Sequence, residues 1–262
     1  MATNVWDPRQ YARYRNERAQ PFFDLMALVR PTPEMRVVDL GCGSGEMTRR
    51  LHQHLGARHT VGIDSSASMF AASQAFASDG LSFLQQDITD FAGGAASGEP
   101  YDLVFSNAAL HWLPDHAALL ARLTSAVAPH GQLAFQVPAN DGHPYHTSAA
   151  DVAEEEPFRT ALGGYVLRGF GCPRPEEYAL LLHRLGYREQ QVRLQVYGHL
   201  LDGPQDVVEW AKGTVLTAYQ QRLPADLFQA FLARYRERLL AQLEDSRPYF
   251  FPFKRVLAWA QR

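Results

Sequence analysis

The most informative segment of this chain is Val37-Val38-Asp39-Leu40-Gly41-Cys42-Gly43-Ser44-Gly45. It consists of a short β-branched run, an acidic residue and three glycines at alternate positions. The run is too short for a globular helix and predicts a buried strand. The glycines allow a sharp turn and leave room for a ligand near the backbone. Segment 46–55 then carries apolar or long side chains on one helix face, so we expect a strand, loop and helix at the ligand edge of an α/β sheet.

The loop differs from two common nucleotide-binding loops. A dinucleotide fingerprint reads G-x-G-x-x-G, but here the third glycine comes one position early and residue 46 is Glu. A P-loop requires a Gly-Lys-Ser or Gly-Lys-Thr sequence, and this stretch contains no lysine. A G-x-G-x-G loop after an acid is instead typical of enzymes that use S-adenosylmethionine. The alternative interpretation is a tight structural turn.

Composition sets limits on the class of protein. The chain has 262 residues, 46% of them apolar, and a formal charge of −3, which gives no reason to expect a nucleic-acid or anionic-membrane partner. Cys42 lies in the glycine loop and Cys172 lies between Gly and Pro, so we expect no disulfide and a reducing compartment. No apolar run approaches the roughly 20 residues of a membrane helix, and the N-terminus has no signal core. We therefore predict a soluble cytoplasmic protein.

The first half of the chain alternates between strand and helix patterns. This alternation predicts a parallel sheet with right-handed crossovers. Two N-terminal helices are expected at 8–19 and from Pro21 to Pro31. The expected parallel strands are 36–40, 60–64, 81–85, 101–106 and 132–137, with a turn at 129–131.

The second half departs from this alternation. Segment 138–175 is rich in Gly and Pro and predicts loops with one short helix at 150–162. A last strand at 250–260 is expected to pair antiparallel with 191–197. Further helices are expected at 176–185, 204–219 and 224–243, the last two forming a lid over the ligand face. We expect one domain of 1–262, made of cap helices (1–30), a cofactor-binding core (31–138), a substrate and lid region (139–250) and the last strand (251–262).

Polar residues follow the predicted strands at their carboxyl ends. Asp64 comes roughly 20 residues after the glycine loop, where a ribose-binding carboxylate is expected. Asp87 follows the third strand and either accepts from an adenine amino group or caps a helix. Asn107, His111 and Trp112 follow the fourth strand, at the mouth of the expected site.

Two other groups have open interpretations. Tyr11, Tyr14 and Arg18 share one helix face, which either closes over a ligand or is an ordinary amphipathic surface. His143 and His146 have the spacing of a metal pair, but no third ligand has suitable spacing, so no metal is expected.

Several motifs resemble those of a known family. DLGCGSG, GIDSS followed by Met69, QQDI and YDLVFSNAALHWLPDH resemble class I S-adenosylmethionine-dependent methyltransferases. Within that class, WDPRQYARYRNERAQP, SNAALHWLPDH and the closing FPFKRVLAWAQR resemble trans-aconitate 2-methyltransferase and its relatives. The resemblance implies a Rossmann-like α/β sheet of about seven strands, mostly parallel with an antiparallel last strand, plus N-terminal cap helices and a helical lid.

The resemblance also assigns residues to S-adenosylmethionine. It implies that the glycine loop holds the methionine part, that Asp64 holds the ribose, and that the N-terminal helix closes over the cofactor. The implied cofactor-binding residues are Tyr11, Arg18, Asp39, Gly41, Cys42, Gly43, Asp64, Ser65, Met69, Asp87, Ile88, Asn107 and Ala108. Candidate substrate-binding residues are Trp112, His143, His146, Tyr219, Lys254 and Arg255.

The implied reaction is O-methylation of a small anionic carboxylate, which is ionised at neutral pH and needs no general base. A hydroxyl, thiol or amine acceptor would need a base, and His111 is the best-placed candidate catalytic residue. A non-catalytic cofactor-binding module is a further alternative, and Glu46 disfavours a nicotinamide enzyme. The expected partner is a small-molecule acceptor, without nucleic acid or membrane, and the expected state is a monomer or homodimer.

Overall fold

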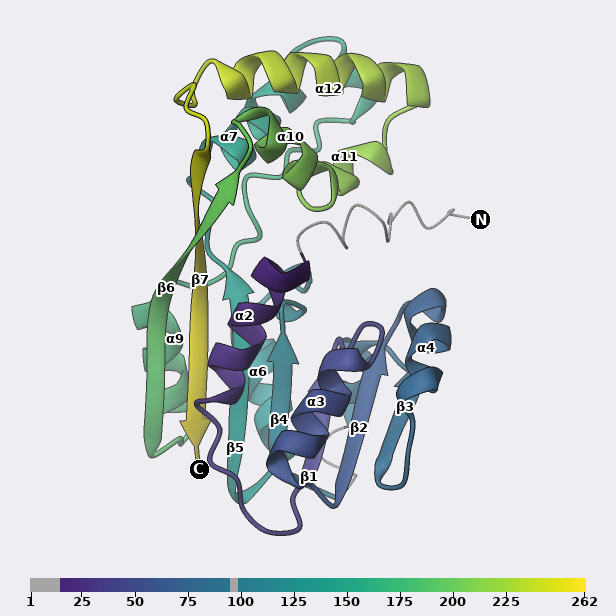
Figure 1. Ribbon diagram of the computed structural model, residues 1–262, viewed down its shortest axis with the longest axis vertical. Coiled ribbons are helices and arrows are strands. Elements are labelled where there is room, and N and C mark those ends of the chain that lie inside the picture. Colours follow the sequence, from purple (N-terminus) through teal and green to yellow (C-terminus); the bar gives the residue numbers. More distant parts are fainter. Residues whose placement is uncertain (1–14, 95–98) are drawn as a thin grey trace. The chain divides into compact units, whose positions relative to one another are not determined.

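A seven-stranded sheet forms the centre of the fold in a computed structural model that describes residues 15–94 and 99–262, with side chains from residue 19 (Figure 1). The strand order is β3-β2-β1-β4-β5-β7-β6. Strands β1 to β5 pair in parallel, whereas β7 runs antiparallel to β5, as predicted. The strands are β1 (Arg36–Leu40), β2 (His59–Asp64), β3 (Leu81–Gln85), β4 (Tyr101–Asn107), β5 (Val127–Pro138), β6 (Glu189–Leu201) and β7 (Tyr249–Gln261).

Helices connect these strands. In the first half they are α2 (Arg15–Met26), α3 (Glu46–Leu55), α4 (Ala67–Ser73), α5 (Ile88–Gly94) and α6 (His116–Ser125). In the second half they are α7 (Pro144–Ala153), α8 (Phe158–Ala161), α9 (Pro175–Arg184), α10 (Gln205–Lys212), α11 (Thr217–Gln220) and α12 (Ala225–Leu240). Short 3-10 turns lie at Gln74–Phe76 and Leu110–Trp112.

Contacts divide the chain into two compact units. The core unit contains residues 19–139, 172–195 and 255–262, and the described residues of the helical unit are 15–18, 140–171 and 196–254. The boundaries at 139/140 and 254/255 fall close to the expected ends of the substrate and lid region. A single domain, with the helical pair as a lid, stays a prediction.

The core unit buries the β-branched and apolar residues of its parallel strands. Val38, Leu40, Val104 and Phe135 are almost fully buried, because helices cover a parallel sheet on both faces. This packing fixes the carboxyl ends of β1 to β4, where the loops that carry the candidate site begin.

The helical unit has its own core, built mainly from aromatic side chains. Trp210 packs edge-on against Phe251 of β7, and Tyr219 stacks on Phe231 of α12 with 4.8 Å between ring centroids. Tyr145 of α7 lies in the same cluster. Such rings bury large apolar areas, so this unit is stabilised independently of the motifs in the first half.

Some element boundaries differ from the expectation. Helix α2 continues through Pro21, because losing one backbone donor is offset by burial of Phe22, Leu25 and Met26. The expected helix 204–219 is interrupted at Gly213 into α10 and α11, and the expected helix 150–162 is replaced by α7 and α8. The expected turn at 129–131 lies inside β5, where the register with β4 shifts and His130 has a φ of 66°.

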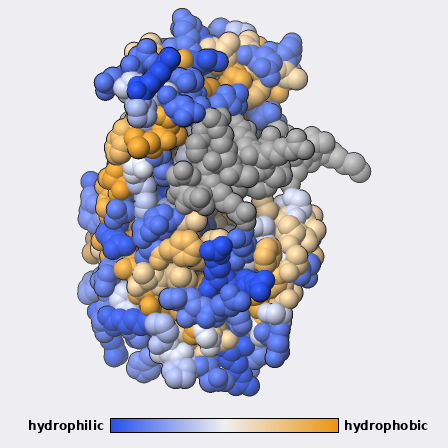
Figure 2. Space-filling view, viewed as in Figure 1, coloured by the Kyte–Doolittle hydropathy of each residue, from blue (hydrophilic) through white to orange (hydrophobic). Residues whose placement is uncertain are grey.

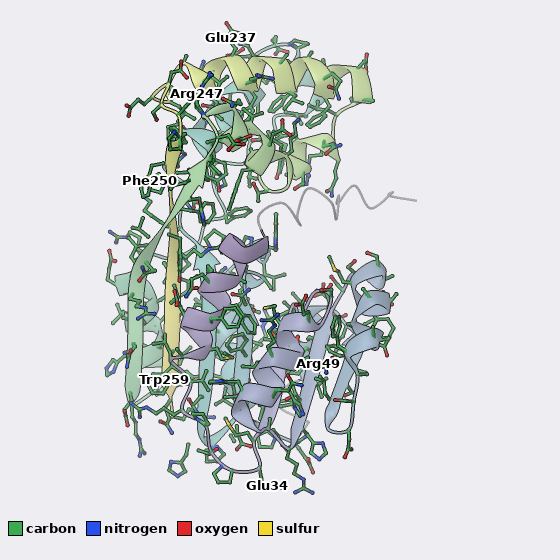
Figure 3. The ribbon with its side chains drawn as sticks, in the orientation of Figure 1. Glu34, Arg49, Glu237, Arg247, Phe250 and Trp259 are labelled. Atoms are coloured by element: carbon green, nitrogen blue, oxygen red, sulfur yellow. The ribbon has the colours of Figure 1, made fainter. Side chains whose placement is uncertain are left out.

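The visible face is largely hydrophilic, with apolar patches between the charged side chains (Figure 2). Exposed apolar residues occur on β6 and β7: Leu200 is 72% exposed, and Phe250 is 57% exposed and projects outward (Figure 3). A Cβ on Gly198 would come within 2.4 Å of the Phe250 ring, so the ring covers this glycine. Among the described helices, none has the length and apolar character to cross a membrane.

Candidate functional site

The glycine loop joins β1 to α3 and is anchored on β2. The N–H groups of Gly41 and Cys42 both donate to the carbonyl of Ile63, at 2.8 and 3.0 Å. Gly41 has a φ of 74°, and a Cβ there would lie 2.3 Å from Ala109 Cβ, so only glycine fits. A Cβ on Gly43 would meet nothing within 4 Å. The loop is therefore tight on its protein side and open at Gly43.

Asp64, at the end of β2, holds two backbone segments together. Its Oδ2 accepts from the N–H of Gly43 at 2.9 Å, and its Oδ1 accepts from the N–H of Ser66 at 2.9 Å. The side chain is partly exposed. The carboxylate thus ties the glycine loop to the start of α4 and still borders the carboxyl edge of the sheet.

Asp39 lies beneath the same loop and is almost fully buried. Its Oδ2 accepts from Thr48 Oγ1 of α3 at 2.6 Å. Burial raises the pKa of Asp39 to about 7; the Thr48 hydrogen bond opposes this rise and the charge of Asp64 adds to it. Burial also raises the pKa of the neighbouring Cys42 thiol far above its usual range, so this cysteine stays protonated.

Asp87 closes β3 and caps the helix that follows. Its Oδ1 accepts from the N–H and the hydroxyl of Thr89, at 2.7 and 2.5 Å. Ser66 caps α4 by accepting from the N–H of Met69. The helix-cap interpretation of Asp87 is therefore confirmed as a structural role, while its contact with adenine stays a prediction. Ser65, Met69, Ile88 and Ala108 are all at least partly exposed at this carboxyl edge.

Asn107 ends β4 and belongs to a buried polar chain. Gln136 Nε2 of β5 donates to Asn107 Oδ1 at 2.8 Å, and Arg255 Nη1 of β7 donates to Gln136 Oε1 at 3.1 Å. Arg255 is only 7% exposed. The structure thus groups Asn107 with Arg255 inside the core unit.

His111 and Trp112 form the 3-10 turn after β4. The His111 ring is buried and lies 4.7 Å from the Trp112 ring, centroid to centroid. Trp112 is 54% exposed. Both residues therefore lie at the predicted end of the sheet, and their roles as base and substrate contact stay predictions.

The other substrate candidates lie in the helical unit. Burial, with the charge of Lys254 adding to it, lowers the pKa of His143 to about 4. Burial, with the neighbouring His143, lowers the pKa of His146 to about 4, so both imidazoles are neutral at physiological pH. Tyr219 is fully buried and its hydroxyl accepts from the N–H of Leu167, so the structure gives it a packing role.

The structure describes the backbone of one predicted cap residue, Arg18, and does not describe the other, Tyr11. Tyr11 lies outside the described residues. Arg18 lies in α2, but its side chain also lies outside the description. Their contacts with the cofactor stay predictions.

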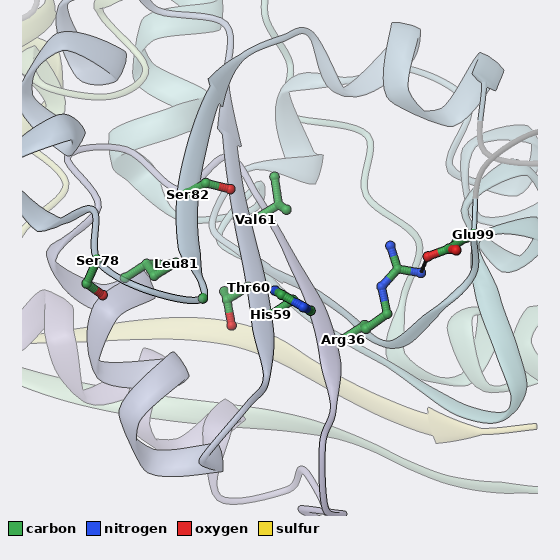
Figure 4. A pocket seen from close by; sticks show the side chains of 9 residues that line it. Arg36, His59, Thr60, Val61, Ser78, Leu81, Ser82 and Glu99 are labelled. Atoms are coloured by element: carbon green, nitrogen blue, oxygen red, sulfur yellow. Dashed lines mark ion pairs between the residues drawn. The ribbon is translucent and has the colours of Figure 1, made fainter.

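One hollow of the core unit lies away from the glycine loop (Figure 4). It is lined at the amino ends of β1 and β2 by Arg36, His59 and Thr60. Arg36 pairs there with Glu99 at 2.7 Å, and its backbone N–H donates to Asp102 Oδ2 at 2.8 Å. Ligands of open α/β sheets bind at the opposite, carboxyl ends, so we assign this hollow no part in the site.

Comparison with known proteins agrees with this geometry. A family model described as "Methyltransferase domain" matches residues 11–192. Trans-aconitate 2-methyltransferase of Deinococcus radiodurans is 41% identical, covering 98% of this chain and 98% of its own length. Trans-aconitate 2-methyltransferase of Streptomyces avermitilis is 37% identical, covering 100% of this chain and 98% of its own.

Solved structures share the fold at low sequence identity. The YcgJ protein of Bacillus subtilis matches with a TM-score of 0.59 and 14% identity, covering 92% of this chain and 97% of its own. Phosphoethanolamine N-methyltransferase 2 of Haemonchus contortus, solved with S-adenosylhomocysteine, matches with a TM-score of 0.54 and 14% identity, covering 92% of this chain and 52% of its own.

The sheet order, the antiparallel last strand and the glycine loop define the class I S-adenosylmethionine-dependent methyltransferases. An enzyme of this class transfers a methyl group to an acceptor, here a small molecule. The chain belongs to the methyltransferase family that includes the trans-aconitate 2-methyltransferases, and its cofactor is S-adenosylmethionine. The core unit fits this cofactor, since Gly43 is open and the carboxylates of Asp64 and Asp87 border one edge.

Sequence reasoning missed several supporting residues. Thr48 is a polar side chain on the buried face of α3, nine positions after Asp39, and that placement was the available signal. Gln136 is one of two buried glutamines in β5. Phe83 packs so closely against Gly45 and Gly62 that a Cβ on either would come within 3.0 Å of its ring, and no local pattern shows this contact.

Proposed function

We propose that this enzyme methylates a carboxylate oxygen of a small di- or tricarboxylic acid. The similarity to trans-aconitate 2-methyltransferases carries the proposal, because it spans nearly the whole chain, including the region after residue 139.

The core unit would hold the cofactor along the edge described above. We propose that Gly41, Gly43 and Asp39 hold the methionine part and that Asp64 holds the ribose hydroxyls. Asp87, Ile88, Ser65 and Met69 would surround the adenine. When bound, S-adenosylmethionine supplies an electrophilic methyl group on a sulfonium. The chain's own contribution is alignment and exclusion of water, which supply much of the rate in such displacements.

Two cations of the chain would favour the acceptor's carboxylates, Lys254 by direct contact and Arg255 through the side chains that it holds. Arg255 is buried beside Gln136, and Lys254 lies next to it in sequence with its backbone fixed by the Asn140 side chain, at 2.8 and 2.9 Å. Lysine and arginine side chains both form charge-assisted hydrogen bonds with carboxylates. Lys254 and Arg255 are therefore the proposed groups that favour an anionic acceptor.

The experiment is a transfer assay with purified protein, labelled cofactor, and a panel of di- and tricarboxylates beside phenols and amines. For a carboxylate acceptor, kcat at saturating cofactor varies little between about pH 6 and 9. A base-dependent acceptor, with His111 as base, would lose rate on acidification. Transfer to phenols or amines alone would contradict the proposal.

We also propose that the enzyme acts in the cytoplasm as a monomer or homodimer, without nucleic-acid or membrane partners. The formal charge of −3 supports this, because it offers no general attraction to polyanions. Light scattering of the purified protein would measure the oligomeric state, and a larger assembly would contradict it.

A further inference from the structure

Three hydrogen-bonded side chains connect β7, β5 and the end of β4 within the core unit. Arg255 donates to Gln136 Oε1 at 3.1 Å, and Gln136 Nε2 donates to Asn107 Oδ1 at 2.8 Å. Gln136 is fully buried, whereas Asn107 is partly exposed at the carboxyl edge of the sheet. The chain of bonds therefore leads from a buried cation to a side chain that borders the proposed site.

The chemistry of arginine fixes the direction of these bonds. A guanidinium has only donors, so Gln136 offers it the amide oxygen and must turn its amide nitrogen toward Asn107. Asn107 then accepts with Oδ1, and its Nδ2 group keeps its protons for other partners. A carboxamide that would otherwise present either end is thereby held in one orientation.

We propose that Arg255 and Gln136 are positioning residues that hold Asn107 Nδ2 toward the acceptor, where it donates a hydrogen bond to a carboxylate oxygen. The inference rests on the proposed function, because it places that acceptor near the end of β4. A donor at this point favours an oxygen anion and disfavours an ammonium, which has only donors of its own. A chain of polarised bonds that begins at a cation strengthens the last donor.

The same strand supplies a matched control. Gln132 lies four residues before Gln136, on the same face of β5, and is 2% exposed. Its Oε1 accepts from Trp259 Nε1 at 2.7 Å and its Nε2 donates to the carbonyl of Arg30 at 2.7 Å. Replacing Gln132 removes a buried amide from the strand at the end away from the site.

The experiment compares Gln136→Leu, Gln136→Glu and Gln132→Leu. It measures the KM of the best carboxylate from the panel, the Kd of S-adenosylhomocysteine, and the thermal midpoint. Gln136→Leu raises the acceptor KM by about 10- to 100-fold, the value of one hydrogen bond to a charged group, and leaves the Kd within about twofold. The carboxylate of Gln136→Glu still pairs with Arg255, but it turns an oxygen toward Asn107 in place of the amide nitrogen. Asn107 Oδ1 then has no donor to accept from, so the acceptor KM rises at least as far as in Gln136→Leu. Gln132→Leu lowers the midpoint and leaves the KM unchanged.

A background variant isolates the path through Asn107. In Asn107→Ala, adding Gln136→Leu causes no further rise in KM. An equal KM for Gln136→Leu, Gln132→Leu and the wild type overturns the inference while the proposed function stands. A parallel loss of S-adenosylhomocysteine binding also overturns it, because the effect is then on the cofactor. If the wild-type enzyme methylates no carboxylate, the proposed function itself is wrong.

Discussion

Asp64 of the core unit holds two backbone segments together, whereas Asp151 and Glu155 of the helical unit pair with arginines of a neighbouring helix. Asp64 accepts from the N–H groups of two loops at the carboxyl edge of the sheet. In the helical unit, Asp151 of α7 pairs with Arg238 of α12 at 2.8 Å, and Glu155 pairs with Arg234 at 2.7 Å. The first arrangement shapes an edge for a ligand. The second joins two helical segments, so these ion pairs serve structure.

A substitution in the glycine loop of the core unit is expected to reduce stability and cofactor binding the most. Gly41→Ala adds a Cβ that would lie 2.3 Å from Ala109 Cβ, at a φ of 74°. We expect a loss of about 3–5 kcal/mol of unfolding free energy, from overpacking and left-handed strain together, and loss of S-adenosylhomocysteine binding. Urea unfolding and calorimetry measure both.

Gly93→Ala is the control for that variant. Gly93 lies in α5, where a Cβ meets nothing within 4 Å, so the change is neutral or stabilises by about 0.5–1 kcal/mol. If Gly41→Ala binds S-adenosylhomocysteine as tightly as Gly93→Ala does, the loop is not the cofactor site.

The stabilities of the two units are expected to depend on pH in different ways. The larger change in unfolding free energy is expected in the core unit. Because burial raises the pKa of Asp39 to about 7, its contribution to stability is complete below the unfolded pKa near 4 and is lost as the pH rises to 7. We expect the wild type to lose up to about 4 kcal/mol of unfolding free energy relative to Asp39→Asn across that window. Urea unfolding of both proteins from pH 4 to 8 measures this difference, and a constant difference would contradict it.

The helical unit is expected to respond to pH with the opposite sign. Because burial lowers the pKa of His146 to about 4, its contribution is complete above the unfolded pKa near 6.5 and is lost as the pH falls toward 4. Relative to His146→Phe, the wild type should lose about 2–3 kcal/mol of unfolding free energy between pH 7 and 4. The same unfolding series measures it, and a wild type that gains stability on acidification relative to this variant would refute it.

The two units also differ in how far the sequence predicted them. In the core unit, strand β1 and helix α3 begin and end at the expected residues. Local patterns suffice there because glycine spacing, caps and short β-branched runs act within a few residues. In the helical unit, α10 ends near Gly213 and α7 begins at Pro144, neither as expected. Those boundaries depend on how Trp210 and Tyr145 pack into the aromatic core, and packing between distant segments leaves no periodic signal.

In the candidate site too, residues that act through partners on other elements could not be predicted from the sequence. Its glycines and acids follow a recognisable spacing, so Gly41, Asp64 and Asp87 were found from the sequence at the edge where the structure has them. Gln136 and Thr48 were not, because each acts through a partner on another element. A residue that holds a neighbour in place carries no motif of its own.

Calorimetric titration of the purified protein with S-adenosylhomocysteine is the decisive measurement for the role of the loop after β1. We expect one binding event per chain at micromolar concentrations, retained in Gly93→Ala and lost in Gly41→Ala. Absence of binding by the wild type at high micromolar ligand would contradict the claim that the loop after β1 holds the cofactor.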